Sequence, residues 1–303
     1  MAKDQPVAHG GQAVIEGVAM RGKSVMATAV RRTDGRIVVD KQVLVPWGER
    51  YPVLKWPLVR GSVAMIESLV VGTKALVFSA AQFAEGEEVE FTAKDTSLVV
   101  LVAFAATVLI FIALPALLVR LLQPLVHSTL LLNLIEGLIK VTLFALYVGG
   151  IGLLPDIRRV FQYHGAEHKT INAYEARDEL TVERVQRHTT LHYRCGSSFI
   201  LLVLIVSILV FSLVTAAGRP PYFTRLLIHL AILPVVAGLS YELIRYASRK
   251  NAFFLFRWLA SPGLLVQWLT TREPSDDQVE VAVRALTEVL GGTDDTPAGA
   301  MVE

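Results

Sequence analysis

Two long stretches of the chain contain no charged residue and are almost wholly apolar. They are residues 97–119 (SLVVLVAFAATVLIFIALPALLV) and residues 198–217 (SFILLVLIVSILVFSLVTAA). A bilayer-spanning helix needs about 20 mostly apolar residues, and both stretches meet that requirement. Residues 130–154 and 225–247 also fit, although each contains charged groups. The sequence therefore predicts a mainly α-helical integral membrane protein with about four transmembrane helices.

The composition supports this class and excludes others. Hydrophobic residues make up 53% of the chain and charged residues 18%, whereas soluble domains have about 45–50% and about 25%. The formal net charge of +2 is too small to indicate a nucleic-acid binder, so no direct nucleic-acid partner is expected. Cys195 is the one cysteine, which excludes an intramolecular disulfide.

The distribution of Lys and Arg predicts the orientation, because these residues are retained on the cytoplasmic side of a membrane. Twelve precede the first span, and the segments that follow contain one (120–129), seven (155–197), two (218–225) and six (241–303). The alternation of many and few places both termini and the 155–197 loop in the cytoplasm. The lipid bilayer is accordingly an expected partner of this multi-pass protein.

Residues 1–57 are expected to form a small β-rich cytoplasmic domain. Residues 24–45 are rich in β-branched side chains and have a Thr-Asp-Gly turn at 33–35, which predicts a β-hairpin. The preceding stretch, GGQAVIEGVAMRG at 10–22, contains four glycines. We interpret it as a structural turn, with the lining of a functional site as the alternative.

Residues 58–96 are expected to form an amphipathic helix over 58–80, followed by an acidic linker. Arg60, Glu67 and Lys74 recur every seven residues and so share one face of that helix. This face is interpreted as the solvated side of a helix that lies in the membrane interface and does not form a fifth span.

The rest of the chain divides into three expected parts. Residues 97–247 form the transmembrane bundle with its His-rich loop, and residues 248–292 form interfacial and cytoplasmic helices. Ser275 begins the last helix through a capping box with Gln278. Residues 293–303 are expected to be a disordered tail.

Four of the seven histidines lie in the 155–197 loop, and two of them form an H-x-x-E-H motif. On a helix, His164 and His168 lie one turn apart on one face, with Glu167 close to that face. Two imidazoles at this spacing can share one zinc ion, and the carboxylate can act as a base on a water molecule. The motif therefore predicts a divalent metal site, with zinc as the expected ion and Glu167 as the catalytic residue.

A catalytic zinc site needs a third protein ligand and an open position. His192 is the first choice for that ligand, and Cys195 the second, because both lie just before a predicted span that fixes their position. If both bind together with His164 and His168, the site is closed and structural. Further candidates are His188, Glu175 and Glu242.

Glu136 and Lys140 lie four residues apart inside a predicted span, with Asn133 one turn earlier. Ionisable groups at such depth usually face the bundle interior and mark function. The alternative is a self-neutralised pair near the outer interface. A third hypothesis for the function is a transporter, and this pair is the only feature that supports it.

Several segments, taken in order, resemble the signatures of the bacterial YqhQ-like membrane proteins, also called domain of unknown function 1385. They are GGQAVIEGVAMRG, YHGAEHKTINAYE (163–175), LHYRCGSSF (191–199), LPVVAGLSYELIR (233–245) and PGLLVQWLTTREPSDDQVEVAVRAL (262–286). The resemblance implies a bacterial cytoplasmic membrane location and a metal-dependent enzyme. It places the metal motif at His164, Glu167, His168, His192 and Cys195.

The leading hypothesis is a zinc-dependent, hydrolase-like membrane enzyme with its site at the cytoplasmic face and a membrane-associated substrate. The alternative is a non-enzymatic scaffold or assembly factor, in which the His cluster is structural and a cytoplasmic protein partner docks. An open three-ligand site favours the enzyme, and a closed four-ligand site favours the scaffold.

Overall fold

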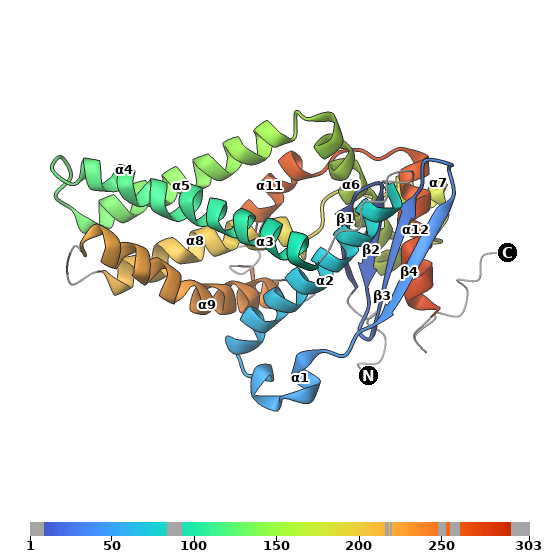
Figure 1. Ribbon diagram of the computed structural model, residues 1–303, viewed down its shortest axis with the longest axis horizontal. Coiled ribbons are helices and arrows are strands. Elements are labelled where there is room, and N and C mark those ends of the chain that lie inside the picture. Colours follow the sequence, from blue (N-terminus) through green and yellow to red (C-terminus); the bar gives the residue numbers. More distant parts are fainter. Residues whose placement is uncertain are drawn as a thin grey trace.

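A small antiparallel sheet lies at one end of an elongated bundle of helices (Figure 1). The structure is a computed structural model that describes residues 9–83, 93–215, 218, 220–247, 253–254 and 261–291. Most of the expected acidic linker and the whole expected tail, 293–303, lie outside these residues.

The sheet has four strands in the order β1-β2-β3-β4, each antiparallel to its neighbour. The expected hairpin is confirmed: β3 pairs with β4 from Val25↔Val43 to Arg31↔Ile37, and Gly35 in the connecting turn has a φ of 86°. The four strands are β1 (Gly10–Val14), β2 (Gly17–Arg21), β3 (Val25–Arg31) and β4 (Ile37–Val43).

The interpretation of the glycine-rich stretch as a turn is corrected, because this stretch forms the two strands β1 and β2. A tight reversal at Glu16, with a φ of 49°, joins them. Gly17 explains part of the glycine content, since a Cβ there would lie 2.2 Å from the carbonyl oxygen of Ala29 on β3. Glycine thus serves the close approach of neighbouring strands.

The helices follow the sheet in chain order. They are α1 (Trp47–Arg50), η1 (Pro52–Lys55), α2 (Val59–Phe83), α3 (Ala93–Val108), the π-helical turn η2 (Leu109–Ala113), α4 (Leu114–Leu122), α5 (Thr129–Ile151), α6 (Pro155–Ala176), α7 (Val182–Gln186), α8 (Gly196–Val214), α9 (Tyr222–Ala247), α11 (Pro262–Thr270) and α12 (Asp276–Leu290). Helices α3, α4, α5, α8 and α9 run along the long axis of the molecule (Figure 1).

Each face of the sheet is covered by helices. Helix α2 packs on one face, where Ala75 meets the core residues Val14, Met26 and Val30. Helices α6 and α12 cover the other face and, with α7 packed against them, form a larger core with β2 and β3. The sheet, the His-rich segment and the C-terminal helix therefore share one hydrophobic core, although they lie far apart in the sequence.

Five helices of the described residues are long and apolar enough to cross a membrane, one more than expected. They are Val59–Phe83, Ser97–Leu122, Thr129–Ile151, Gly196–Val214 and Tyr222–Ala247. The outer surface of the second is apolar, with Phe104 59% exposed and Leu101 63% exposed. Such a surface suits contact with lipid and not with water.

The additional candidate is α2, which is long and apolar enough to cross a membrane although Ala75 in its middle packs on the sheet. The expectation that this helix lies in the membrane interface and does not form a fifth span stays a prediction. The polar residues on its shared face are not simply solvated. Arg60 forms an ion pair with Glu242 of α9, and Glu67 forms one with Arg21 of β2. These contacts pair two of the three charged residues on this face, whereas Lys74 is exposed as expected.

The start of the last helix agrees with expectation. The Ser275 side chain accepts from the backbone of Gln278, and the Gln278 side chain accepts from the backbone N–H of Ser275, as a capping box requires. Helix α12 ends at Leu290, before Gly291.

Candidate metal centre

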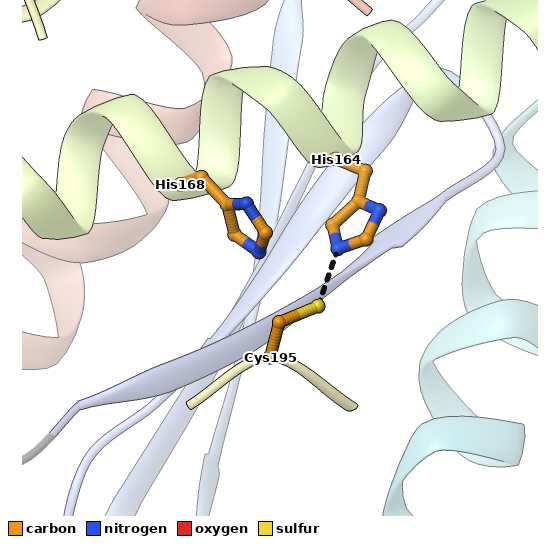
Figure 2. A group of neighbouring side chains, drawn as sticks. All are labelled: His164, His168 and Cys195. Atoms are coloured by element: carbon orange, nitrogen blue, oxygen red, sulfur yellow. Dashed lines mark hydrogen bonds between the residues drawn. The ribbon is translucent and has the colours of Figure 1, made fainter. Parts of the chain in front are cut away.

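Helix α6 brings His164 and His168 to one face, as the spacing predicts. Pro155 occupies the first turn, where its missing N–H costs nothing, and Arg177 ends the helix in the left-handed region with a φ of 59°. The two imidazole rings are 4.4 Å apart between centroids. Both rings point from α6 toward the same space (Figure 2).

Cys195 approaches this space from a different element. It is the N-cap of α8, and its Sγ accepts a hydrogen bond from the backbone N–H of Ser197. The Sγ atom lies 3.1 Å from Nε2 of His164 (Figure 2). One ligand atom from each of His164, His168 and Cys195 lies within 4.8 Å of the other two. The structure thus joins the middle of α6 to the start of α8 through three metal-type ligands.

Hydrogen bonds to backbone carbonyls set the tautomers of both imidazoles. Nδ1 of His164 lies 2.8 Å from the carbonyl oxygen of Thr270, and Nδ1 of His168 lies 2.5 Å from that of Thr190. A carbonyl oxygen only accepts, so each Nδ1 carries the proton and each Nε2 of a neutral ring is an acceptor, which in His164 faces the Cys195 thiol. Metal-binding histidines in proteins usually have this arrangement.

Burial favours the neutral, ligand-competent form of His168. This side chain is 1% exposed, and desolvation lowers the pKa of His168 below its ordinary value, although Cys195 acts in the opposite direction. Burial similarly lowers the pKa of His192.

Glu167 is buried beside the histidines and faces β1. Burial raises the pKa of the Glu167 carboxyl, while His164, His192 and the backbone of Gly11 act in the opposite direction. A Cβ at Gly11 would lie 2.9 Å from Cγ of Glu167 and 2.8 Å from the carbonyl oxygen of Ala19. The glycine-rich stretch therefore lines the site at Gly11, which was the alternative interpretation of its glycines.

His192, the first choice for the third ligand, lies next to the converging group but outside it. Its ring centroid is 5.7 Å from that of His168, and its Nε2 lies 3.6 Å from a carboxylate oxygen of Glu175. Gln267 of α11 holds the backbone of His192, accepting from its N–H at 2.8 Å and donating to its carbonyl at 2.7 Å. These two hydrogen bonds hold the turn that leads from His192 to Cys195 in place.

The structure places the remaining candidate ligands away from the group. His188 lies 3.2 Å from Asp178, and Glu242 pairs with Arg60 at the α2–α9 contact. Sequence reasoning missed the supporting residues Thr190, Gln267 and Thr270. A polar residue such as Gln267 in an apolar helix is a signal that could have drawn attention to it, because buried polar groups are normally hydrogen-bonded.

The donor set fits a metal ion. Two imidazoles and one thiol are the ligand types that zinc prefers, and three protein ligands leave one coordination position. The fold and the site together define a mainly helical protein with five apolar helices of membrane-spanning length, a small antiparallel sheet and a candidate metal centre between them.

The chain belongs to the family described as "Protein of unknown function (DUF1385)", whose model matches residues 56–292. It is 39% identical over 298 residues to the "Uncharacterized protein YqhQ" of Bacillus subtilis (strain 168), an alignment that covers 94% of this chain and 93% of the relative. No solved structure matches. The family resemblance seen in the motifs is thereby confirmed, and the comparisons supply no activity.

Proposed function

We propose that this protein is a multi-pass protein of the bacterial cytoplasmic membrane that holds a zinc ion through His164, His168 and Cys195 and catalyses a hydrolytic reaction. The observation that carries the proposal is the convergence of three ligand atoms within 4.8 Å, with both imidazoles oriented by backbone carbonyls. Such orientation of ligands before binding is typical of metal sites.

The chemistry follows from the ligand count and from the carboxylate beside it. A zinc ion with three protein ligands polarises a water molecule at its remaining position. Glu167 is the one acid of the H-x-x-E-H motif and lies on the same stretch of α6 as both histidines. It would accept the proton of the attacking water, as the carboxylate does in zinc hydrolases with inverted motifs.

The position of the centre supports a substrate at the membrane surface. Helix α6 follows directly after α5, and Cys195 caps α8, so the ligands lie where two candidate spans end and begin. In this proposal the segment 155–197 and both termini lie in the cytoplasm, which the excess of Lys and Arg in that segment supports. A membrane-associated substrate is the class that this placement favours.

A second candidate function has support in the burial of the site. His168 is 1% exposed and Cys195 is 6% exposed, as in structural zinc sites, which are enclosed. In that case the metal would cross-link α6 to α8 and stabilise a scaffold that docks a cytoplasmic partner. The two functions differ in whether the fourth position is open.

The open position can be tested with the cobalt-substituted protein and acetohydroxamate, a small ligand for open zinc-type sites. A hydrolytic centre predicts that acetohydroxamate changes the visible absorption bands of the bound cobalt in a saturable way. Cobalt bands that acetohydroxamate leaves unchanged would favour the structural centre and overturn the hydrolytic proposal. Protein that takes up no cobalt would overturn both.

A further inference from the structure

A second buried polar cluster lies in the helical bundle, apart from the candidate metal centre. It occupies the N-terminal parts of α5 and α9 and the C-terminal end of α8, which meet at the end of the bundle away from α6 (Figure 1). All of its members are 2–6% exposed, and they are Asn133, Glu136, Lys140, Thr215, Arg225 and His229.

Glu136 is the centre of this cluster. Its Oε1 lies 2.8 Å from Nζ of Lys140 and 2.8 Å from Nε2 of His229. Its Oε2 accepts from Nε of Arg225 at 2.8 Å. Asn133 accepts from the same guanidinium at 2.9 Å and donates to the hydroxyl of Thr215 at 3.0 Å. One carboxylate therefore serves three basic side chains.

The two nitrogens of His229 both face oxygen atoms that accept. Nε2 faces the Glu136 carboxylate, and Nδ1 lies 2.9 Å from the carbonyl oxygen of Arg225. Both oxygen atoms are acceptors, so a ring with a single N–H donates to one of them only. Apart from His229, the cluster combines the two basic side chains Lys140 and Arg225 with the single acid Glu136.

No other acidic residue can balance this excess from the helices that surround it. Residues 97–155 contain Glu136 as their one acid, and residues 196–241 contain none. Glu242, the next acid in α9, is paired with Arg60. The excess of one positive charge comes from Lys140 and Arg225 against Glu136.

Several donors in the cluster also lack an acceptor among the described residues. The Lys140 ammonium has three N–H groups, and Glu136 is its one partner there. Nη1 of Arg225 donates to none of the described residues, whereas Nε and Nη2 are engaged. Buried unbalanced charge is costly, and most of all inside a membrane.

We infer that this cluster is a binding site for a small anion, which supplies the missing negative charge and accepts from Lys140 and Arg225. The class is a chloride- or phosphate-type anion, either free or as the phosphate of a lipid headgroup. Phe211 stacks on His229 with centroids 3.9 Å apart and lies under the guanidinium of Arg225 at 4.6 Å. This ring shields one side of the cluster and favours a compact ligand. The inference is independent of the proposed hydrolytic function.

The test measures the thermal stability of the full chain in nanodiscs of phosphatidylcholine, at constant ionic strength, as gluconate is replaced by chloride or inorganic phosphate. A saturable rise in Tm with one of these anions is expected, because a ligand that binds only the folded state stabilises it by mass action. A third arm adds phosphatidylglycerol to the nanodiscs. A response confined to that arm identifies the lipid phosphate as the anion.

Two variants in the cluster should shift the half-saturating concentration in opposite directions. Lys140→Gln removes one positive charge and should raise it about tenfold, and Glu136→Gln removes the negative charge and should lower it about tenfold. Lys74→Gln is the control, since Lys74 is an exposed lysine of α2. If Lys140→Gln does not fold, Lys140→Arg keeps the charge and should respond as the wild type does.

A wild-type protein whose Tm depends on neither free anion nor on phosphatidylglycerol would overturn the inference, whatever the variants do. Shifts of Lys140→Gln and Glu136→Gln in the same direction would also overturn it, since they would show a loss of packing and not a change in the charge that attracts an anion.

Discussion

Glu167→Gln is expected to abolish hydrolytic turnover while the zinc content stays at the wild-type value. The amide keeps the size of the carboxylate but cannot accept a proton, and loss of a general base typically costs about a hundredfold to ten-thousandfold in rate. The residue is buried against Gly11 and has no ligand atom in the converging group, so metal binding should survive. Turnover is measured on a panel of chromogenic esters and a fluorogenic peptide in detergent micelles.

Glu183→Gln is the matched control for this prediction. The Glu183 side chain is 79% exposed and pairs with Arg187 at the surface, so turnover should not change. A Glu167→Gln variant that is as active as the wild type would exclude Glu167 as the base. Wild-type protein that hydrolyses none of the panel would count against the hydrolase and leave the structural centre favoured.

Gly165→Ala is expected to destabilise the fold and to disturb the metal centre. A Cβ at Gly165 would lie 2.0 Å from the carbonyl oxygen of Arg272, a contact with backbone that no side-chain movement relieves. The segment after α11 must therefore move away from α6, and it directly follows Thr270, the last residue of α11, whose carbonyl oxygen orients His164. We expect a loss of about 3 kcal/mol in the free energy of unfolding, measured by chemical denaturation in detergent.

Gly149→Ala provides the comparison for Gly165→Ala. A Cβ at Gly149, within α5, meets no atom within 4 Å, so alanine there should be neutral or stabilise the helix by up to about 1 kcal/mol. Equal stability of Gly165→Ala and the wild type would mean that α6 and the segment at Arg272 are not packed as described.

Local patterns in the sequence predicted much of the helical fold. The uninterrupted apolar runs gave the spans, and turn and cap residues gave the β3–β4 hairpin and the start of α12. The strands β1 and β2 were missed because four glycines resemble a loop, whereas Gly17 is needed for the close approach of strands, which sequence spacing does not reveal. The partners of Arg60 and Glu67 on α2 were missed for a similar reason, since these ion pairs join residues that are distant in the sequence.

In the candidate site, too, the part that lies within one helix could be predicted from the sequence, and the part that depends on packing between elements could not. The spacing of His164 and His168 fixes their common face, because both belong to one helix. The third position depends on how α8 and α11 pack against α6, and this packing brings Cys195 closer than His192. The contribution of Gly11 likewise depends on the sheet meeting α6, which spacing along the chain cannot predict.

Metal analysis of the purified protein decides whether the three converging side chains hold an ion. We expect about one zinc per chain in the wild type and in His192→Ala, and almost none in His168→Ala and Cys195→Ala. The retained zinc of His192→Ala distinguishes the three-residue site from one that includes His192. Wild-type protein without stoichiometric metal, or His168→Ala with a full complement, would contradict the metal centre and the function proposed for it.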